Sequence, residues 1–360
     1  MLTVWDWFGQ RSFNHTDFSE LAGLGTPHPS VTLILPTREV AGTIGPILDT
    51  VARLNERGGL VSQVVVVDAD SADGTADIAR SHDAEVYSEN ELCPEFGPAQ
   101  GKGDAMWRAL SVAHGDIIMY ADTDTTDFEE HFIYGTLGPL LTVPGVKFCK
   151  AAYRRPFAGE VRPVADGGGR VTELMAKPLL NFFYPELTGF VQPLAGEFAV
   201  SRDLLLRTPF LTGYGVEIAL LIDVLGAAGL EALSQVDLGS RQNRHQPLFD
   251  LTRMSSAVLR ALARRVPGLG PGQSGGGWEP DTYLHAVATQ DGLRFDEHLS
   301  ELLERPPMAG VLAQAEVPAA LRGACGVRFL PCDVHEGVRG GDAVAVAVPG
   351  DRDRAWCDVL

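Results

Sequence analysis

The sequence predicts an α/β fold in which a mostly parallel sheet is flanked by helices. Three short apolar runs, at 31–35, 64–67 and 116–121, have the length and composition of buried strands. Helix-like segments separate them, and this alternation is typical of a doubly wound parallel sheet. Each run ends in polar or acidic residues. Ligands gather at the carboxyl ends of the strands in such sheets, so we expect the functional site there.

The first two strands begin this pattern. The strand Val31–Leu35 is followed by a helix at about 44–54. The strand Val64–Val67 ends in acidic residues, and Asp73 or Thr75 can cap the helix that follows. Together these segments predict two successive β-α units.

Two carboxylates follow the third predicted strand. Asp122 and Asp124 flank Thr123 in a D-x-D sequence directly after the run 116–121. Mg²⁺ and Mn²⁺ prefer oxygen ligands, and an ion bound by two carboxylates keeps positions for a substrate diphosphate. A bare D-x-D is also common in acidic surface turns, because so short a motif occurs by chance. Its place at the end of a buried strand favours the metal site, which a nucleotide-sugar transferase needs.

Two glycine-rich segments precede predicted helices and suit anions. Gly97–Asp104 contains Lys102, and Gly167–Leu174 contains Arg170 and Thr172. Glycines allow the backbone to approach a ligand closely, helix starts favour negative charge, and the basic side chains add positive charge. The alternatives are an ordinary turn for the first segment and a flexible loop with a solvated arginine for the second.

A further acidic residue lies at the start of an apolar helix. Gly213–Ile218 leads into the apolar segment Ala219–Leu225. In this place Glu217 can reach the hydroxyl groups of a sugar. Alternatively, it is only a favourable acid in the first helical turn.

Composition restricts the class of protein and its partners. The chain has 360 residues, 45% apolar content and a net charge of −18, which provides a sizeable core and little attraction for nucleic acid. No apolar run reaches the roughly 18 residues of a membrane span, and no secretory leader is evident. The five cysteines lack C-x-x-C spacing and predict neither a zinc site nor a disulfide framework. We expect a cytoplasmic protein with no membrane or nucleic-acid partner.

Several short motifs between residues 10 and 260 occur in a characteristic order. They are Asn14-His15, Gly101-Lys102-Gly103, the Asp122/Asp124 pair, Tyr153-Arg154-Arg155-Pro156, Gly168–Leu174, Gln192–Glu197 and Tyr214–Glu217. Together they resemble the glucosyl-3-phosphoglycerate and mannosyl-3-phosphoglycerate synthases, which are retaining glycosyltransferases with the GT-A fold. The resemblance implies that a UDP- or GDP-sugar is the donor, that a small anion, 3-phosphoglycerate, is the acceptor, and that Mg²⁺ or Mn²⁺ is the cofactor.

The resemblance also implies roles for individual residues. The donor nucleotide would meet Pro36, Glu39, Asp68, Lys102, Asp122, Thr123 and Tyr214. The acceptor would meet Gly169, Arg170, Thr172, Arg241 and His245. Asp124, Glu217 and the backbone near Leu194 would lie at the reacting centre. In this family, retention is attributed to front-face attack, with the leaving diphosphate assisting deprotonation of the acceptor.

One motif departs from the family pattern. The family usually carries R-x-H-R-N-[QR]-P-L, whereas this chain has Arg-Gln-Asn-Arg-His-Gln-Pro-Leu at 241–248. The position of the family's metal-binding histidine is therefore Asn243, and His245 replaces an asparagine expected near phosphoglycerate. An amide oxygen can bind Mg²⁺, and a two-residue slip would instead bring His245 to the metal. We expect Asp122, Asp124 and either Asn243 or His245 as metal ligands.

The predicted organisation has five parts. An N-terminal segment (1–30) precedes a nucleotide-sugar-binding half (31–125) and an acceptor-binding half (126–265). A Gly/Pro-rich linker (266–280) then leads to a C-terminal extension (281–360). Apolar runs in the extension can form strands or an oligomer contact, and we expect a homodimer.

Two other functions stay open from sequence alone. The changed segment 241–246 is compatible with a related transferase of secondary metabolism, such as one that transfers a sugar to ergothioneine in lincosamide assembly. A non-catalytic nucleotide-sugar sensor is less favoured, because both Asp122 and Asp124 are present.

Overall fold

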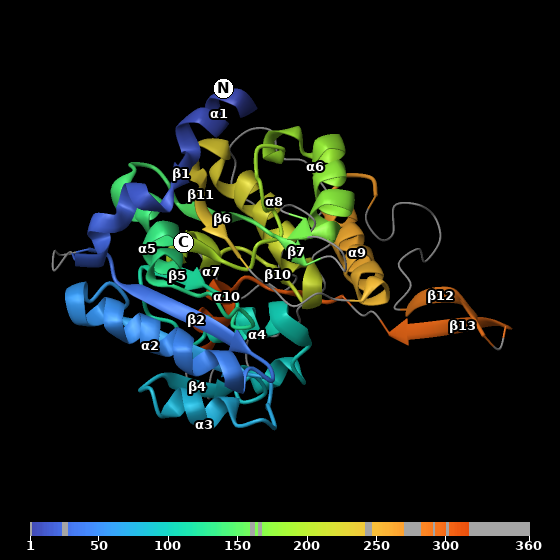
Figure 1. Ribbon diagram of the computed structural model, residues 1–360, viewed down its shortest axis with the longest axis horizontal. Helices are drawn as coiled ribbons and strands as arrows, with labels where there is room; N and C mark the ends of the chain where they lie inside the picture. The colour runs from blue at the N-terminus through green and yellow to red at the C-terminus, as the bar shows by residue number, and fades with distance from the viewer. Residues whose placement is uncertain are drawn as a thin grey trace, which may run out of the picture. The chain divides into compact units, whose positions relative to one another are not determined.

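An eight-stranded sheet forms the centre of the structure, a computed structural model that describes residues 2–23, 28–158, 163–164, 168–241, 247–269, 282–290, 292–299 and 302–316. In spatial order its strands are β1 (Ser12–Asn14), β11 (Leu233–Ser240), β6 (Phe148–Arg154), β9 (Phe198–Ser201), β5 (Ile117–Tyr120), β2 (Val31–Thr37), β3 (Gln63–Asp68) and β4 (Glu85–Ser88). Neighbouring strands are parallel except at β9, which is antiparallel to β5 and β6. In Figure 1, blue β1 lies beside yellow β11, so segments far apart in the sequence meet in one sheet. The predicted mostly parallel sheet is confirmed.

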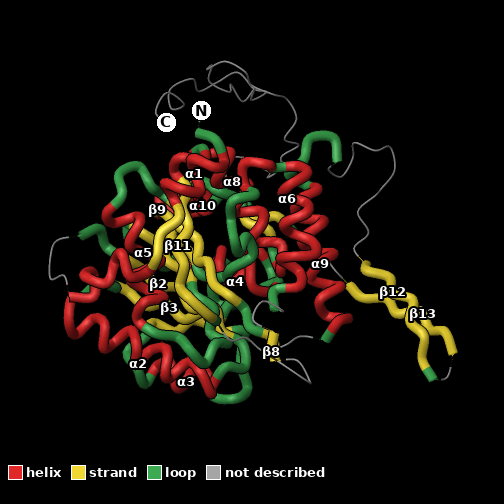
Figure 2. The backbone as a smooth tube through the Cα atoms, turned by 45° about the horizontal axis from the view of Figure 1, so that its top comes forward, coloured by secondary structure: helices red, strands yellow, loops and turns green. Residues whose placement is uncertain are grey.

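Helices cover both faces of this sheet (Figure 2). The described α-helices are α1 (Val4–Arg11), α2 (Ala41–Gly58), α3 (Thr75–Arg80), α4 (Gly101–Ala109), α5 (Glu130–Thr142), α6 (Lys177–Phe183), α7 (Arg202–Leu206), α8 (Val216–Ala228), α9 (Leu248–Ala263) and α10 (Met308–Glu316). Side chains alternate between the two faces of a strand, so Leu33 and Ile34 of β2 enter different cores. Leu33 shares a core with Ile44 of α2, and Ile34 shares the other with Trp107 of α4.

The predicted elements occur with small differences in their bounds. The helix expected at 44–54 extends from Ala41 to Gly58. At the start of α3 the N-cap is Gly74, and Asp73 before it accepts hydrogen bonds from the backbone and hydroxyl of Thr75. The helix expected after the second glycine-rich segment includes a π-helical turn at Thr172–Ala176 before α6. None of the described helices is long and apolar enough to span a membrane.

Three two-stranded sheets complete the described structure. They pair β7 (Phe157–Ala158) with β8 (Pro163–Val164), β10 (Phe210–Leu211) with β14 (Glu304–Arg305), and β12 (Thr282–Thr289) with β13 (Gly292–Leu299). The β10–β14 pair attaches the last described segment to the fold, since Arg305 hydrogen-bonds both carboxylate oxygens of Asp104 at 2.8 and 2.7 Å.

The structure forms one compact unit over most of the expected parts of the chain. Residues 1–316 cluster together, so the expected boundary between the halves 31–125 and 126–265 falls inside this unit. Residues 270–280 of the expected linker lie outside the described residues, as do the apolar runs at 327–330 and 343–348.

Gly103 permits the close packing of α4 against β10 and the start of α8, and this contact gives a stability prediction. A Cβ at this position would overlap the carbonyl oxygen of Leu211 and crowd Val216. We expect Gly103→Ala to lower the free energy of unfolding by about 1–3 kcal/mol in urea titrations, as overpacking does. The control is Gly42→Ala in α2, where a Cβ meets nothing within 4 Å and a change below about 1 kcal/mol is expected. Equal stability of the two variants would contradict the close contact.

Candidate active site

A cavity of about 620 Å³ lies where β2, β5, β6 and β11 end. Twelve of the site residues expected from sequence line it: Pro36, Lys102, Asp122, Thr123, Asp124, Gly169, Arg170, Thr172, Leu194, Tyr214, Glu217 and Arg241. Residues expected for the donor, the metal and the acceptor therefore border one continuous space.

Four expected site residues are not among those that line the cavity. Asp68 is buried and accepts hydrogen bonds from the hydroxyls of Thr37 and Ser71, both at 2.8 Å. Glu39 accepts one from the backbone after β3. Both acids therefore stabilise the turn after β3. Asn243 and His245 lie outside the described residues.

Asp122 lies against two cationic side chains. Its carboxylate is 2.5 Å from the ammonium of Lys102 and 3.3 Å from the guanidinium of Arg241. Burial by itself raises the pKa of Asp122, but Lys102 and Arg241 outweigh it and hold this pKa well below its usual range. Gly196 leaves the space that the carboxylate fills, because a Cβ on Gly196 would overlap it. Asp122 is therefore a fixed anion.

Arg241 is the centre of a buried ion cluster. It directly follows β11, its side chain is 0% exposed, and it forms an ion pair with Glu197, whose side chain is also 0% exposed. Its guanidinium also donates to the hydroxyl of Tyr153 (3.1 Å) and contacts Asp124 (3.3 Å). Tyr153 in turn donates to Glu197 at 2.9 Å. Burial raises the pKa of Glu197, and Arg241 opposes this rise.

Two helix N-termini bring Lys102 and Glu217 to the cavity. Lys102 lies in the first turn of α4, Glu217 in the first turn of α8, and their side chains are 2.8 Å apart. Burial disfavours the charged form of Lys102, but Asp122 and Glu217 outweigh it and raise the pKa of Lys102 above its usual range. Asp124 differs from these residues, because 54% of its side chain is exposed to the cavity side.

Basic groups line one part of the cavity. Arg155 and Arg170 both line it, next to Gly168 and Gly169. Arg155 donates to the hydroxyl of Tyr153 at 3.0 Å, but its buried Nε has no partner among the described residues. Gly169 has a φ of +67°, a backbone conformation that favours glycine. This side of the cavity therefore suits an anion.

Sequence reasoning assigned no role to several residues of this site. Glu197 and Arg155 lie within motifs that carried the resemblance. Arg155 directly follows β6, and Glu197 reaches the cluster because it precedes β9, which runs antiparallel to β5 and β6. Lys150 is buried against the rings of Phe148 and Phe198, and burial lowers its pKa to about 8 although Glu217 and Glu197 oppose this shift. An apolar strand interrupted by one lysine was the only available signal.

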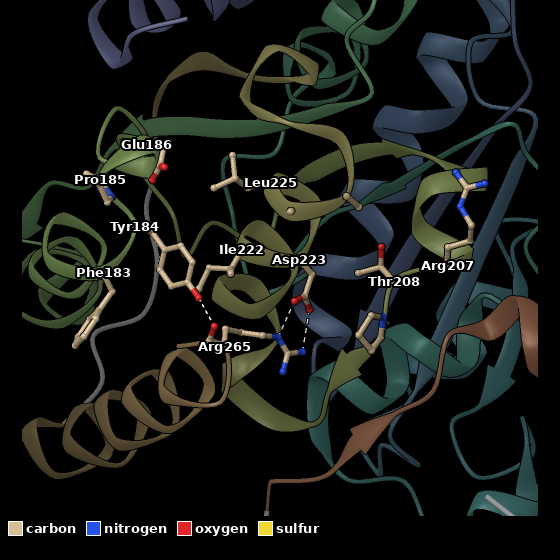
Figure 3. Close-up of a pocket in the computed structure, with 13 residues that line it drawn as sticks. Phe183, Tyr184, Pro185, Glu186, Arg207, Thr208, Ile222, Asp223, Leu225 and Arg265 are labelled. Atoms are coloured by element: carbon tan, nitrogen blue, oxygen red, sulfur yellow. Dashed lines mark hydrogen bonds and ion pairs between the residues drawn. The ribbon is translucent and has the colours of Figure 1, made fainter. Parts of the chain in front are cut away.

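A second cavity, of about 610 Å³, has different chemistry (Figure 3). Its principal charged groups are paired with each other: Arg265 makes two hydrogen bonds to Asp223, at 2.7 and 2.8 Å, and an ion pair with Glu304. The hydroxyl of Tyr184 donates to the backbone oxygen of Arg265. We therefore place the chemistry in the first cavity, where carboxylates and cations from several elements converge.

No group of three or more His, Cys, Asp and Glu residues that could hold a metal occurs in the described part of the chain. The pair Asp122 and Asp124 would therefore hold a cation together with oxygens from a substrate, from water or from the undescribed segment 242–246.

The fold and this acidic pair define the class of protein, a nucleotide-sugar-dependent glycosyltransferase. Residues 32–142 match the model of the family described as glycosyl transferase family 2. The chain is also 40% identical over 308 residues to the glucosyl-3-phosphoglycerate synthase of Mycolicibacterium smegmatis, an alignment that covers 84% of this chain and 97% of that protein. The chain belongs to the glucosyl-3-phosphoglycerate synthase family.

Solved structures agree with this assignment. The mannosyl-3-phosphoglycerate synthase of Rubrobacter xylanophilus has 55% identity and a TM-score of 0.77, with 86% of this chain and 98% of that chain covered. The glucosyl-3-phosphoglycerate synthase of Mycobacterium tuberculosis, crystallised with Mn²⁺, UDP-glucose and phosphoglyceric acid, has 37% identity and a TM-score of 0.67, with 79% and 91% covered. The predicted GT-A fold and the resemblance to this family are confirmed.

The buried cluster predicts a large stability difference between two arginines. Arg241→Met leaves Glu197 buried without its cation, so we expect a loss of about 3–5 kcal/mol in the free energy of unfolding at neutral pH. Arg207→Met removes only a surface pair with Asp203, with side chains 61% and 78% exposed, and should cost less than about 1 kcal/mol.

The loss from Arg241→Met should also shrink in acid. Burial already raises the pKa of Glu197. At low pH Glu197 is protonated, and the Arg241→Met variant then no longer contains an uncompensated buried charge. Urea denaturation of both variants and the wild type at several pH values measures this. A loss for Arg241→Met as small as that for Arg207→Met would show that the cluster does not stabilise the fold.

Proposed function

We propose that this protein is a retaining glycosyltransferase that transfers a hexose from a UDP- or GDP-sugar to 3-phosphoglycerate. One observation carries the proposal: a single cavity joins the acidic pair Asp122 and Asp124 to the basic segment around Arg170. The relative from M. tuberculosis binds Mn²⁺, UDP-glucose and phosphoglyceric acid, and the relative from R. xylanophilus is a mannosyl-3-phosphoglycerate synthase. The relatives named here give no support to an ergothioneine acceptor.

The donor side of the cavity fits a metal-bound diphosphate. Asp122 and Asp124 supply carboxylate oxygens, the ligand type that Mg²⁺ and Mn²⁺ prefer, and Lys102 and Arg241 already hold Asp122 in its ionised form. A bound divalent ion would neutralise negative charge that develops on the leaving diphosphate. Lys102, at the start of α4, is placed to turn from Asp122 towards a phosphate oxygen.

The acceptor side fits the phosphate and carboxylate of 3-phosphoglycerate. Arg170, Thr172 and Gly169 border the cavity there, and Arg155 adds a partly buried cation. These groups would hold the acceptor so that its hydroxyl faces the sugar, near the backbone of Leu194. In front-face transfer the hydroxyl attacks the anomeric carbon as the bond to the diphosphate breaks, and a diphosphate oxygen takes the proton. Glu217 and Tyr214 would then border the transferred sugar.

The proposal also includes a homodimer, a cytoplasmic location, and separate donor-binding and acceptor-binding halves of the chain. Exposed apolar side chains on the β12–β13 hairpin, among them Leu293 (91% exposed) and Phe295 (67%), support a homodimer. Free thiols at Cys93 and Cys149 support a reducing, cytoplasmic location. The positions of the acidic pair and of Arg170 support a donor half at 31–125 and an acceptor half within 126–265.

Asp124→Ala should abolish transfer while the fold is retained. The side chain is 54% exposed and, among the described residues, pairs with Arg241 alone, at 3.3 Å, whereas its loss from a metal site would cost several kcal/mol in the transition state. We expect the variant to lose the rise in melting temperature that MnCl₂ and UDP together give the wild type. The exposed Asp77→Ala is the control. Full activity of Asp124→Ala in excess chelator would reject a metal at this pair.

Arg170→Ala should raise the KM for 3-phosphoglycerate far more than the KM for the donor. Loss of a charge-assisted hydrogen bond weakens binding about ten- to a hundredfold. Purified wild type, supplied with MnCl₂, UDP- or GDP-hexoses and 3-phosphoglycerate, should give a phosphoglycerate-linked product detectable by mass spectrometry. The control is Arg154→Ala, which removes the exposed arginine next to Arg155 in the sequence. Arg154 does not line the cavity, so this variant should behave as the wild type. Absence of this product with every hexose donor and metal would overturn the proposed function.

A further inference from the structure

The cavity extends along the sheet edge to Glu89. This residue directly follows β4 and lines the same cavity as Asp122. Strands β4, β3, β2 and β5 are consecutive neighbours, so three spacings of about 4.8 Å separate the two strand ends by about 14 Å. This is comparable to the reach of a nucleotide from its diphosphate to the far edge of its base. A nucleotide with its diphosphate at Asp122 is therefore long enough to bring its base to Glu89.

Glu89 differs from the acids of the neighbouring loops, which do not line the cavity. Glu39, Asp68 and Asp70 each accept hydrogen bonds from neighbouring residues. No described residue donates a hydrogen bond to the carboxylate of Glu89. A half-buried carboxylate without a protein partner is costly unless a ligand supplies donors.

The backbone of Glu89 is held in place on both sides. Its N–H donates to the carbonyl of Asp68 at 2.9 Å, and its carbonyl accepts from the buried guanidinium of Arg108 at 3.3 Å. Arg108 also donates to the carbonyls of Leu92 and Gly97. The side chain is thus presented to the cavity from a fixed loop, as selective recognition requires.

We propose that the carboxylate of Glu89 binds the base of the donor nucleotide and favours guanine over uracil. This inference rests on the proposed function of the cavity. The Watson–Crick edge of guanine offers two adjacent donors, N1–H and N2–H, which match the two oxygens of a carboxylate. Uracil offers one donor, N3–H, between two carbonyl oxygens, so a carboxylate makes one hydrogen bond and faces a repelling oxygen.

The environment of Glu89 makes this preference depend on pH. Burial raises the pKa of Glu89 to about 7; Asp104 and Asp70 add to the rise, whereas Arg38 and Arg108 oppose it. Below this pKa the carboxyl group carries both a donor and an acceptor, which match O4 and N3–H of uracil. Above it, only acceptors remain. The preference for guanine should therefore grow as pH rises through about 7.

Calorimetric titration of GDP and of UDP, each with MnCl₂, tests this proposal at about pH 5.5 and about pH 8. Effects of pH on the shared diphosphate and metal cancel in the ratio of the two affinities. We expect wild type at the higher pH to favour GDP by about tenfold or more, the scale of a bidentate base contact, and to lose most of this preference at the lower pH. Glu89→Gln, which carries a fixed donor and acceptor, should lose both the preference and its pH dependence.

Glu91→Gln is the matched control, because Glu91 lies on the same loop but is exposed and does not line the cavity. It should keep the wild-type ratio at both pH values. A ratio in wild type that does not change with pH would overturn the proposal. So would equal weakening of both nucleotides by Glu89→Gln, which would indicate a contact with the ribose instead. Failure of wild type to bind either nucleotide would reject the proposed function as well, whereas binding that is insensitive to Glu89 rejects only the base contact.

Discussion

The ion cluster around Arg241 is the constraint on which the site depends. A buried guanidinium needs carboxylates close by, and they come from two other parts of the chain: Asp122 and Asp124 follow β5, whereas Glu197 directly precedes β9. Glu197 reaches this position because β9 runs antiparallel to its neighbours, which places its first residues at the edge where β5 and β6 end. The exceptional strand of the sheet thus supplies the buried anion of the site.

A second buried ion pair fixes the glycine-rich segment before α4. Asp104 is fully buried, accepts a backbone hydrogen bond from Gln100, and pairs with Arg108 and Arg305. Arg305 belongs to the short strand β14, beyond the region that carried the resemblance. Residues near the end of the described chain therefore help to hold the helix start that presents Lys102, while Arg108 also supports the loop of Glu89.

The sequence predicted the parts of the structure that depend on local patterns. Apolar runs gave β2, β3 and β5, and the D-x-D after β5 pointed to the cavity because carboxyl ends of parallel strands share an edge. The roles of Glu197, Arg155 and Glu89 were not predictable in this way. Each depends on which strands are neighbours and in which direction they run, and a period-2 or period-3.6 pattern contains neither fact. Asp68 shows the converse: an acid at a strand end can serve the turn rather than the ligand.

The net negative charge of the protein makes anion binding depend on the charged groups inside the cavity. A net charge of −18 disfavours anionic substrates at long range, but salt screens this repulsion beyond about 8–10 Å, so the groups that line the cavity decide binding. Lys102 and Arg241 are already neutralised by Asp122, Glu217 and Glu197. A diphosphate entering the donor side would meet little uncompensated positive charge from these residues. We infer that a divalent cation on the acidic pair supplies the missing attraction on the donor side.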